Sequence, residues 1–490
     1  MKKRKIAVIL IVILIGICFV GCGNSIGRIS KGLDTYTITA TYNQKDQIIS
    51  AAQIVKFTNN TSQALEDIKF HIFASIYKQD ATTSVIMPED RVKAYPQGYS
   101  YGDIEIDSAS VDSSPVAFTV EGQILSLPLA TPLAPESSIS IALIYDISLA
   151  NIHHRLGYGR NTVNLGNWFP ILCNFDNGWQ TTPYYAIGDP FVSQVANYTL
   201  TLVAPSNLII ASSGRETNKS IEGETATYTY KANCVRDFAL VMSSKFKVLT
   251  AQMGETTLNY YYFNDESAQV TMSLACKAFE YYSNTFGKYP YPTLAIAQTD
   301  FCYGGMEYPS LIYYNANLLG EEKLQAIAHE IAHQWWYGVV GNDQISSPFM
   351  DEGLAELSTA MFFGQADEFK ITKESILNNM LASYTTYLDV IGTYVTSVDT
   401  SMRSLDKFTS GQEYAFISYV KSCLMFNELS KLMGEKQFVK GLAKYYDHCL
   451  MKIATPSEMI SCFSSVYGAD LTKWFECFFE GKDVLAKPNK

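Results

Sequence analysis

The chain has 490 residues, of which 47% are hydrophobic and 17% are charged. This length predicts two or three domains rather than one core, and the composition excludes a disordered chain. The formal net charge of -11 excludes nucleic acid as a partner, because no surplus of Lys and Arg is available to neutralise phosphates.

The first 22 residues have the pattern of an export signal. Basic residues 2–5 precede an apolar run over residues 6–20, which is shorter than a comfortable membrane span and is typical of a signal peptide. The run ends in Gly21-Cys22, which resembles a bacterial lipobox, although Phe19 replaces the usual Leu. We therefore expect a signal peptide over 1–21 and a lipid anchor at Cys22, which would hold the chain on the outer face of the cell membrane. An uncleaved anchor helix is the alternative.

The cysteines beyond the signal do not indicate a thiolate site. None of the eight forms a CxxC pair, so neither a cysteine zinc site nor a redox motif is expected. Their spacing leaves disulfide pairing open, and most are expected to be small buried apolar residues.

Residues from about 36 to 263 have a β pattern. Period-two alternation and turn clusters predict strands at 35–42, 68–77, 138–145 and 198–203. Many short strands with few helical stretches indicate an antiparallel β-sheet domain, which we place at 22–250.

After about residue 267 the apolar spacing changes to three and four. This spacing predicts helices at 267–286, 321–337, 348–363, 410–433, 435–447 and 455–467. Thr455-Pro456-Ser457-Glu458 marks a helix start, and Gly434 and Gly468 mark helix ends. The fold class is therefore α+β, with a mostly helical domain over 251–490.

The motif with the clearest chemistry is His329-Glu330-Ile331-Ala332-His333. On a helix, two imidazoles four residues apart lie on one face and can bind one zinc ion, while the adjacent Glu faces a metal-bound water. The apolar neighbourhood disfavours two idle surface histidines. The sequence holds four other histidines, and of these we expect His153-His154 to be ordinary polar surface.

A third ligand is expected at Glu352. It lies in the first turns of a helix opened by Ser346-Ser347-Pro348, with Asp351 at the helix start. Glu356 falls on the same face four residues later, where it either orients a ligand or is a solvated carboxylate.

Eighteen residues, 334–351, separate His333 from Glu352, and this arrangement resembles the zinc signature of the M1 aminopeptidases, whose peptidase domain is thermolysin-like. Upstream, the stretch Gly304-Gly305-Met306-Glu307-Tyr308 is similar to the GxMEN exopeptidase motif of that family. The resemblance implies that Glu307 binds the α-amino group of the substrate. It also implies that the backbone of Gly304, Gly305 and Met306 aligns the peptide.

Other segments carry the resemblance further. Residues 286–292 are similar to the segment that leads into the GxMEN strand, and Trp335-Trp336 follows the zinc helix as in the family. Ser418-Tyr419-Val420-Lys421-Ser422 resembles the YxKG segment, which implies that Tyr419 stabilises the oxyanion, with Tyr414 in reserve. Because the sequence ends at Lys490, we expect no long C-terminal helical domain.

The chain departs from the family at three points. Tyr308 replaces Asn, Ser422 replaces Gly, and residues 165–170 resemble the ARxxFP segment without its Ala-Arg. The family's second amine anchor, from the β domain, has no recognisable counterpart in the sequence.

The expected function is therefore that of a zinc aminopeptidase with one Zn²⁺ per chain, acting on peptides with a free N-terminus at the outer cell surface. Glu330 is the expected general base. A zinc endopeptidase or a peptidase of narrow specificity is the first alternative, motivated by Tyr308 and the missing anchor. A surface-anchored binding protein with an inactive peptidase fold is the second.

Overall fold

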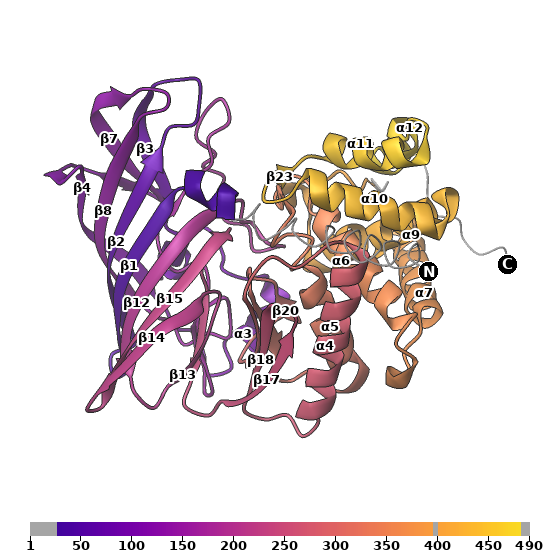
Figure 1. Cartoon of the computed structure of the whole chain (residues 1–490), viewed down its shortest axis with the longest axis horizontal. Coiled ribbons are helices and arrows are strands. Elements are labelled where there is room, and N and C mark those ends of the chain that lie inside the picture. The colour runs from indigo at the N-terminus through magenta and orange to yellow at the C-terminus, as the bar shows by residue number, and fades with distance from the viewer. Residues whose placement is uncertain (1–26, 395–399, 482–490) are drawn as a thin grey trace, which may run out of the picture.

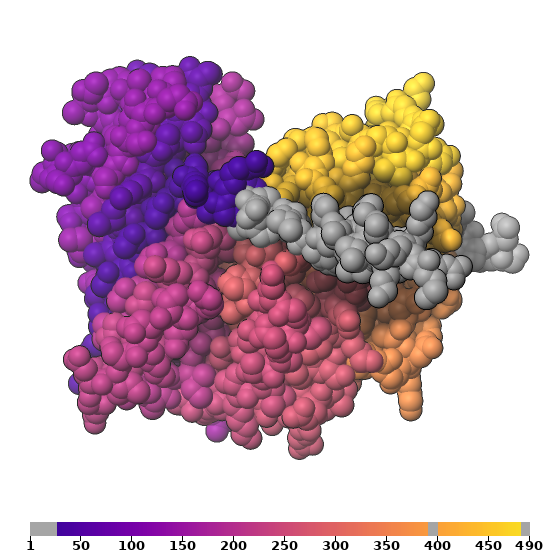
Figure 2. Space-filling view, viewed as in Figure 1, coloured from indigo at the N-terminus to yellow at the C-terminus, as the bar shows by residue number. Residues whose placement is uncertain are grey.

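The structure is a computed structural model that describes residues 27–394 and 400–481. The predicted signal peptide and Cys22 lie outside these residues. In the part of the chain that is described, no helix is both long and apolar enough to cross a membrane. A body of β sheets comes first and a mostly helical body follows (Figure 1), which confirms the predicted α+β organisation. In the space-filling view the indigo and purple residues of the N-terminal part lie on one side and the orange and yellow residues of the later part lie on the other (Figure 2).

An eight-stranded sheet dominates the β domain. In β1 the side chains of Tyr36, Ile38 and Ala40 are buried and alternate with exposed threonines, as the period-two pattern predicts. In spatial order the strands are β14 (Arg215–Glu222), β15 (Thr225–Val235), β12 (Ala196–Pro205), β1 (Thr35–Asn43), β2 (Ile48–Thr58), β8 (Ser138–Ser148), β4 (Asp103–Val111) and β5 (Ser114–Pro115).

The large sheet is antiparallel as predicted, except where β1 meets β12. These two strands run parallel, with Thr35 opposite Asn197 and Thr41 opposite Val203. Parallel neighbours require a long crossover connection. Here the connection consists of all the strands between β1 and β12, so no local sequence signal could reveal the pairing.

Two four-stranded sheets complete the β domain. One contains β13 (Ile209–Ser212), β16 (Leu240–Ser243), β10 (Val163–Leu165) and β9 (Leu156–Tyr158), and the other contains β11 (Ile171–Leu172), β3 (Leu65–His71), β7 (Ile124–Leu133) and β6 (Thr119–Glu121). The strand predicted over 68–77 ends at His71. Phe73–Tyr77 is instead the 3₁₀ helix η2, because five consecutive buried residues carry no alternation that distinguishes a strand from a helix.

A five-stranded sheet with helices at its side begins the second half of the chain. Its order is β17 (Lys247–Met253), β18 (Thr256–Tyr262), β19 (Thr293–Thr299), β21 (Leu311–Asn315) and β20 (Gly305–Met306). Helix α4 (Ala268–Thr285) contacts β17 and β18, and helix α5 (Gly320–Ala332) contacts β20 and β21. The predicted domain boundary near residue 250 falls within β17.

The remaining helices form the rest of this half. They are α6 (Phe349–Phe363), α7 (Lys373–Tyr394), α8 (Gly411–Tyr414), the π-helix η6 (Ala415–Lys421), α9 (Ser422–Met433), α10 (Glu435–His448), α11 (Pro456–Tyr467) and α12 (Thr472–Phe479). The predicted cap is present, since Thr455 and Glu458 form a capping box at α11. Helices α7 and α12 were not predicted, and α7 contains Asn378-Asn379 and Thr385-Thr386, which are weak helix formers.

Short elements link these larger ones. They are η1 (Ser30–Gly32), η3 (Pro88–Asp90), α3 (Arg91–Ala94), η4 (Asp367–Phe369), η5 (Leu405–Lys407) and the strand pair β22 (Gly341–Asn342) and β23 (Ile453–Ala454). No disulfide joins the cysteines of the described residues.

Candidate metal centre and cavity

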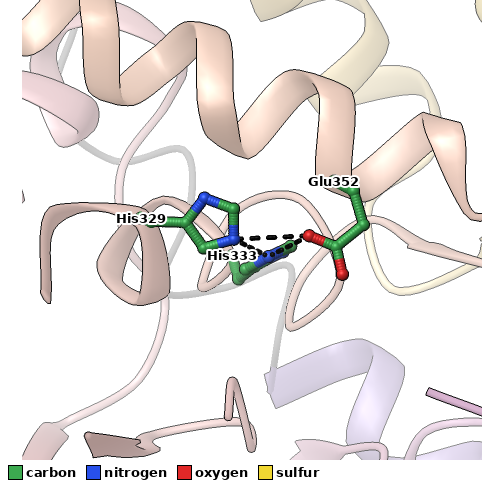
Figure 3. A group of neighbouring side chains, drawn as sticks. All are labelled: His329, His333 and Glu352. Atoms are coloured by element: carbon green, nitrogen blue, oxygen red, sulfur yellow. Dashed lines mark hydrogen bonds and ion pairs between the residues drawn. The ribbon is translucent and has the colours of Figure 1, made fainter. Parts of the chain in front are cut away.

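Helix α5 brings the two predicted imidazoles together at its C-terminal end. His329 lies in the last turn and His333 is the C-cap residue, so their rings project from the same face. The two Nε2 atoms lie 2.9 Å apart (Figure 3). His333 Nδ1 is 2.9 Å from the carbonyl oxygen of Trp336, which fixes the ring and leaves Nε2 for a ligand.

The carboxylate of Glu352 reaches the same point from α6. Its Oε2 lies 3.2 Å from Nε2 of His333 and 3.3 Å from Nε2 of His329 (Figure 3). Three donors around a tetrahedral zinc ion would be separated by roughly 3.3 Å, from bond lengths of about 2.0–2.1 Å. The donor set and its spacing therefore fit one Zn²⁺ with a fourth position left open.

A second group of metal-ligand side chains fits a metal less well. Ligand atoms of His448, Cys449 and Glu458 lie within 4.8 Å of one another. However, the Glu458 carboxylate accepts the hydrogen bonds of the α11 capping box, and burial raises the pKa of Cys449 to about 12, which disfavours a thiolate. The metal centre is therefore assigned to His329, His333 and Glu352.

Carboxylates lie close to both imidazoles of the metal centre. Burial lowers the pKa of His329, but Glu356 and Glu352 together raise it well above its ordinary value. Oε1 of Glu356 lies 3.3 Å from Nδ1 of His329, on the nitrogen that faces away from the ligand triad. Of the two interpretations of Glu356, this ion-pair distance favours a carboxylate that orients a ligand, and no hydrogen bond to Nδ1 accompanies it among the described residues.

Glu330 lies beside the triad with its carboxylate in the cavity. Burial raises the pKa of Glu330 to about 8, and its Oε2 has no hydrogen-bond partner among the described residues. A Cβ at Gly305 would overlap this carboxylate. Gly305 is therefore required by space, and Glu330 lines the cavity without a hydrogen-bond partner at Oε2 among the described residues.

Tyr419 reaches the triad from the π-helix η6. Its hydroxyl donates a hydrogen bond of 2.7 Å to Oε1 of Glu352, and its ring stacks on His329 at a centroid distance of 5.8 Å. Short π-helical turns are rare in proteins, and those that occur are often found at functional sites. Tyr414 is also buried and lines the same cavity, with its ring 5.5 Å from that of Tyr419.

Glu307 lies at the end of β20, close to the metal centre. Burial, reinforced by the negative charge of Asp189, raises the pKa of Glu307 to about 7. Gln344 Nε2 donates a hydrogen bond of 2.9 Å to its Oε1. Gly304 and Gly305 line the cavity beside it, whereas Met306 is buried with its sulfur 3.2 Å from Nε of Arg155.

Tyr308, the departure from the GxMEN pattern, does not line the cavity. It is fully buried, and its hydroxyl donates to Oδ1 of Asn167 at 2.8 Å. A Cβ atom at position 166 would collide with that hydroxyl, so the close approach of Tyr308 requires Gly166. The residues 166 and 167 that replace part of the family's ARxxFP segment are thus the residues that accommodate Tyr308.

The β domain supplies two charged residues that the sequence did not reveal. Asp189 and Arg155 line the cavity and form an ion pair, and Arg155 also donates to the carbonyl oxygen of Gly188 at 3.0 Å. Asp189 lies in a Gly-Asp-Pro turn, and the sequence pattern does not distinguish this turn from an ordinary surface loop. His154, predicted as polar surface, is fully buried because its Nδ1 pairs with the Tyr77 hydroxyl at 2.7 Å.

These residues surround one cavity of about 710 Å³ between the β domain and the helical half. Metal ligands, Glu330, Glu307 and Tyr419 share this cavity with Asp189. A larger groove of about 1220 Å³ between α7, α9 and α12 shares none of these residues. A cavity of this size suits a peptide of a few residues.

The sequence is similar to known peptidases. Residues 270–478 match the model of the peptidase family M1 domain. The alanine/arginine aminopeptidase of Saccharomyces cerevisiae is 25% identical over 303 residues, which are 56% of this chain and 34% of the relative. Aminopeptidase N of Lactococcus lactis is 23% identical over 228 residues, which are 44% of this chain and 27% of the relative. The chain thus spans about a third or less of the length of these relatives.

Solved structures share the fold. The M1 zinc metallopeptidase of Deinococcus radiodurans superposes with a TM-score of 0.68 at 15% identity, covering 93% of this chain and 95% of that one. A mutant of that enzyme bound to the substrate Tyr-Ser-Ala gives 0.66 at 15% identity, covering 93% and 96%. The likeness extends over both halves of the described chain. Residues 270–478 therefore resemble the peptidase family M1 domain, and the described chain shares its fold with an M1 zinc metallopeptidase.

Proposed function

We propose that this chain is a zinc-dependent aminopeptidase that removes N-terminal residues from peptides. The observation that carries the proposal is that Glu307 shares one cavity with the triad His329, His333 and Glu352. A fixed carboxylate beside a metal centre suits a substrate whose ammonium group lies one residue from the scissile bond. The names of the relatives, which are aminopeptidases, support peptide substrates with a free N-terminus.

A zinc ion held by His329, His333 and Glu352 would polarise the scissile carbonyl and make a water molecule more acidic. Glu330, which lines the same cavity, would accept a proton from the attacking water and return it to the leaving amine. Tyr419 places its hydroxyl at the triad, where it donates to the carbonyl oxygen as negative charge develops.

The substrate amine is held by Glu307, with Asp189 as a second negative charge from the β domain. The ion pair of Asp189 with Arg155 fixes this carboxylate at the end of the cavity. The buried Glu307 carboxylate favours a free N-terminus over a blocked one, because a blocked substrate would leave its charge without a cationic partner, whereas Asp189 is already paired with Arg155.

One of the two observations that favoured an endopeptidase, the Tyr308 substitution, no longer supports it. Tyr308 packs against Asn167 away from the cavity, so its substitution does not alter the residues that face the substrate. Asp189 lines the same cavity as Glu307 and comes from the β domain. An inactive binding protein would not need the buried carboxyl of Glu330 beside the metal ligands in the same cavity.

We also propose that Cys22 is lipidated and holds the enzyme at the outer face of the cell membrane. The support is the basic segment 2–5, the apolar run 6–20 and the lipobox-like Gly21-Cys22. A Cys22→Ala variant should fail to incorporate labelled fatty acid and should leave the membrane fraction. Labelling that persists in this variant would rule out Cys22 as the anchor.

The function is tested by comparing three substrates. Amino-acid p-nitroanilides, their N-acetylated forms and internally quenched peptides are incubated with and without a chelator, followed by added Zn²⁺. Cleavage of the free-amine substrates alone, lost with chelator and restored by Zn²⁺, is the expected result. Cleavage of the blocked peptides would show an endopeptidase, and a rate indifferent to chelation would overturn the zinc mechanism.

A further inference from the structure

Two glutamines fix Glu307 from different directions. Gln334, which follows the zinc ligand His333, holds the backbone: its Nε2 donates to the carbonyl oxygen of Tyr308 at 3.2 Å and its Oε1 accepts from the amide of Ser310 at 2.8 Å. Gln344 holds the side chain, since its Nε2 donates to Oε1 of Glu307 at 2.9 Å. Among the described residues, Gln344 is the side chain that donates a hydrogen bond to the Glu307 carboxylate.

The backbone of Gln344 is held by a turn. Oδ1 of Asp343 accepts from the amides of Ile345 and Ser346, both at 3.0 Å, and the amide of Ser347 donates to the carbonyl oxygen of Asp343 at 2.8 Å. An Asp side chain that accepts hydrogen bonds from the following backbone amides stabilises such a turn locally, without contacts from other segments. The side chain of Gln344 is 1% exposed, so its amide points inward from a fixed loop.

The second N–H of the same amide reaches the metal-binding helix. Gln344 Nε2 also lies 2.9 Å from Oδ2 of Asp351, and Oδ1 of Asp351 accepts from the amide of Glu352 at 2.9 Å. Asp351 is 2% exposed. One primary amide therefore joins Glu307 to the first turn of α6, which carries the metal ligand Glu352.

A neutral amide suits this place for a chemical reason. A Lys or Arg here would neutralise Glu307 and compete with the substrate ammonium group for it. An apolar side chain would leave Oε1 of a buried carboxylate without a donor. An amide orients the carboxylate through one oxygen and leaves its charge, and its other oxygen, for the substrate.

We propose that Gln344 is a positioning residue for the amine site: it holds the Glu307 carboxylate at a fixed distance from Glu352, and so sets the selectivity for a free N-terminus. This inference rests on the proposed aminopeptidase function. It concerns a residue outside the HExxH and GxMEN-like motifs, in the segment between His333 and Glu352.

The test is the Gln344→Met variant, which keeps the length of the side chain and removes both donors. The KM for free-amine p-nitroanilides should rise by about 10- to 30-fold, with kcat changed by less than about threefold, as for loss of a hydrogen bond to a charged group. Zinc content should stay at the wild-type value. Gln344→Asn, whose amide is one methylene too short to join both carboxylates, should raise KM in the same direction. Gln365→Met, at an exposed glutamine after α6, is the matched control.

A double-variant comparison separates positioning from folding. In a Glu307→Ala background, adding Gln344→Met should not raise KM any further, because the carboxylate that Gln344 orients is absent. An equal loss in both backgrounds would show that Gln344 acts on the loop in general and would overturn the inference. An unchanged KM in Gln344→Met, with the wild type still selective for free amines, would overturn it while leaving the proposed function intact. A wild-type enzyme without zinc-dependent cleavage of free-amine substrates would instead refute the proposed function and this inference with it.

Discussion

Oε1 of Glu356 lies 3.3 Å from Nδ1 of His329, while Nε2 of the same ring faces His333 and Glu352. A carboxylate behind a metal-binding imidazole fixes the ring and makes it a better ligand. Glu356→Ala should therefore weaken Zn²⁺ binding by about 10- to 100-fold. The dissociation constant is measured by competition with a chromogenic chelator, with the exposed Glu280→Ala as control. An unchanged constant would return Glu356 to the role of a solvated carboxylate.

Replacing Glu330 by Gln removes the proton acceptor and keeps the shape of the side chain. We expect kcat to fall by about 10²–10⁴-fold, the range for loss of a general base, with zinc bound as in the wild type. Zinc content by atomic absorption and kcat on a p-nitroanilide check both halves of this prediction. A variant that kept its rate would rule out the mechanism.

Tyr419→Phe should lower kcat by about 10²–10³-fold with little change in KM, because its hydroxyl acts on charge that develops in the transition state. Tyr414→Phe removes the neighbouring hydroxyl in the same cavity and should have a smaller effect. Steady-state kinetics of the two variants decide between them. A larger loss in Tyr414→Phe would exchange the two roles.

Tyr308→Phe should affect stability and not substrate choice. The change leaves Oδ1 of the buried Asn167 without its donor, which costs about 1–3 kcal/mol of the free energy of unfolding. Urea denaturation measures this loss. The ratio of free-amine to N-acetylated cleavage should stay at its wild-type value, and a change in that ratio would link Tyr308 to amine recognition.

Stability should fall as the pH rises from about 4 to about 7 because of Asp237. Burial raises the pKa of its carboxyl to about 7 in the folded chain, from an ordinary value of 3.8. Between these two values the folded state keeps a proton that the unfolded state loses, so a rise in pH favours unfolding by up to about 1.4 kcal/mol per pH unit.

The matched change is Asp237→Asn, which cannot titrate. The difference in unfolding free energy between wild type and variant should shift by about 3–4 kcal/mol across this window, in favour of the variant at the higher pH, and should be constant outside it. Urea denaturation at several pH values measures the slope. A constant difference throughout would show that Asp237 is ionised in the folded chain.

Local patterns predicted much of the fold and the centre of the site. The spacing of His329 and His333 is a property of one helix, and Glu352 lies near the start of the next large one, so their meeting follows from periodicity and a motif. Alternation likewise located β1, β8 and β12. These features depend on residues that are close together in the chain, so one sequence is enough to predict them.

What escaped prediction depends on contacts between distant segments. Asp189 and Arg155 enter the cavity only because the β domain packs against the peptidase half, and Gln344 reaches Glu307 only through its turn. His154 was misjudged because its partner, Tyr77, lies 77 residues away. Such buried polar residues look like ordinary loop residues until their partners are known.

The parallel pairing of β1 with β12 sets an order of assembly during synthesis. β2 pairs with one side of β1 as soon as residue 58 has been made, but the other side waits for residues 196–205. At about 5–20 residues per second, the 152 residues from 44 to 195 take roughly 8–30 s to be made. Throughout that time the nascent chain presents an open strand edge, of the kind that recruits other unfolded chains. The β domain therefore matures as a late unit, and mutations that slow its closure should reduce the yield of folded enzyme before they affect the stability of the finished fold.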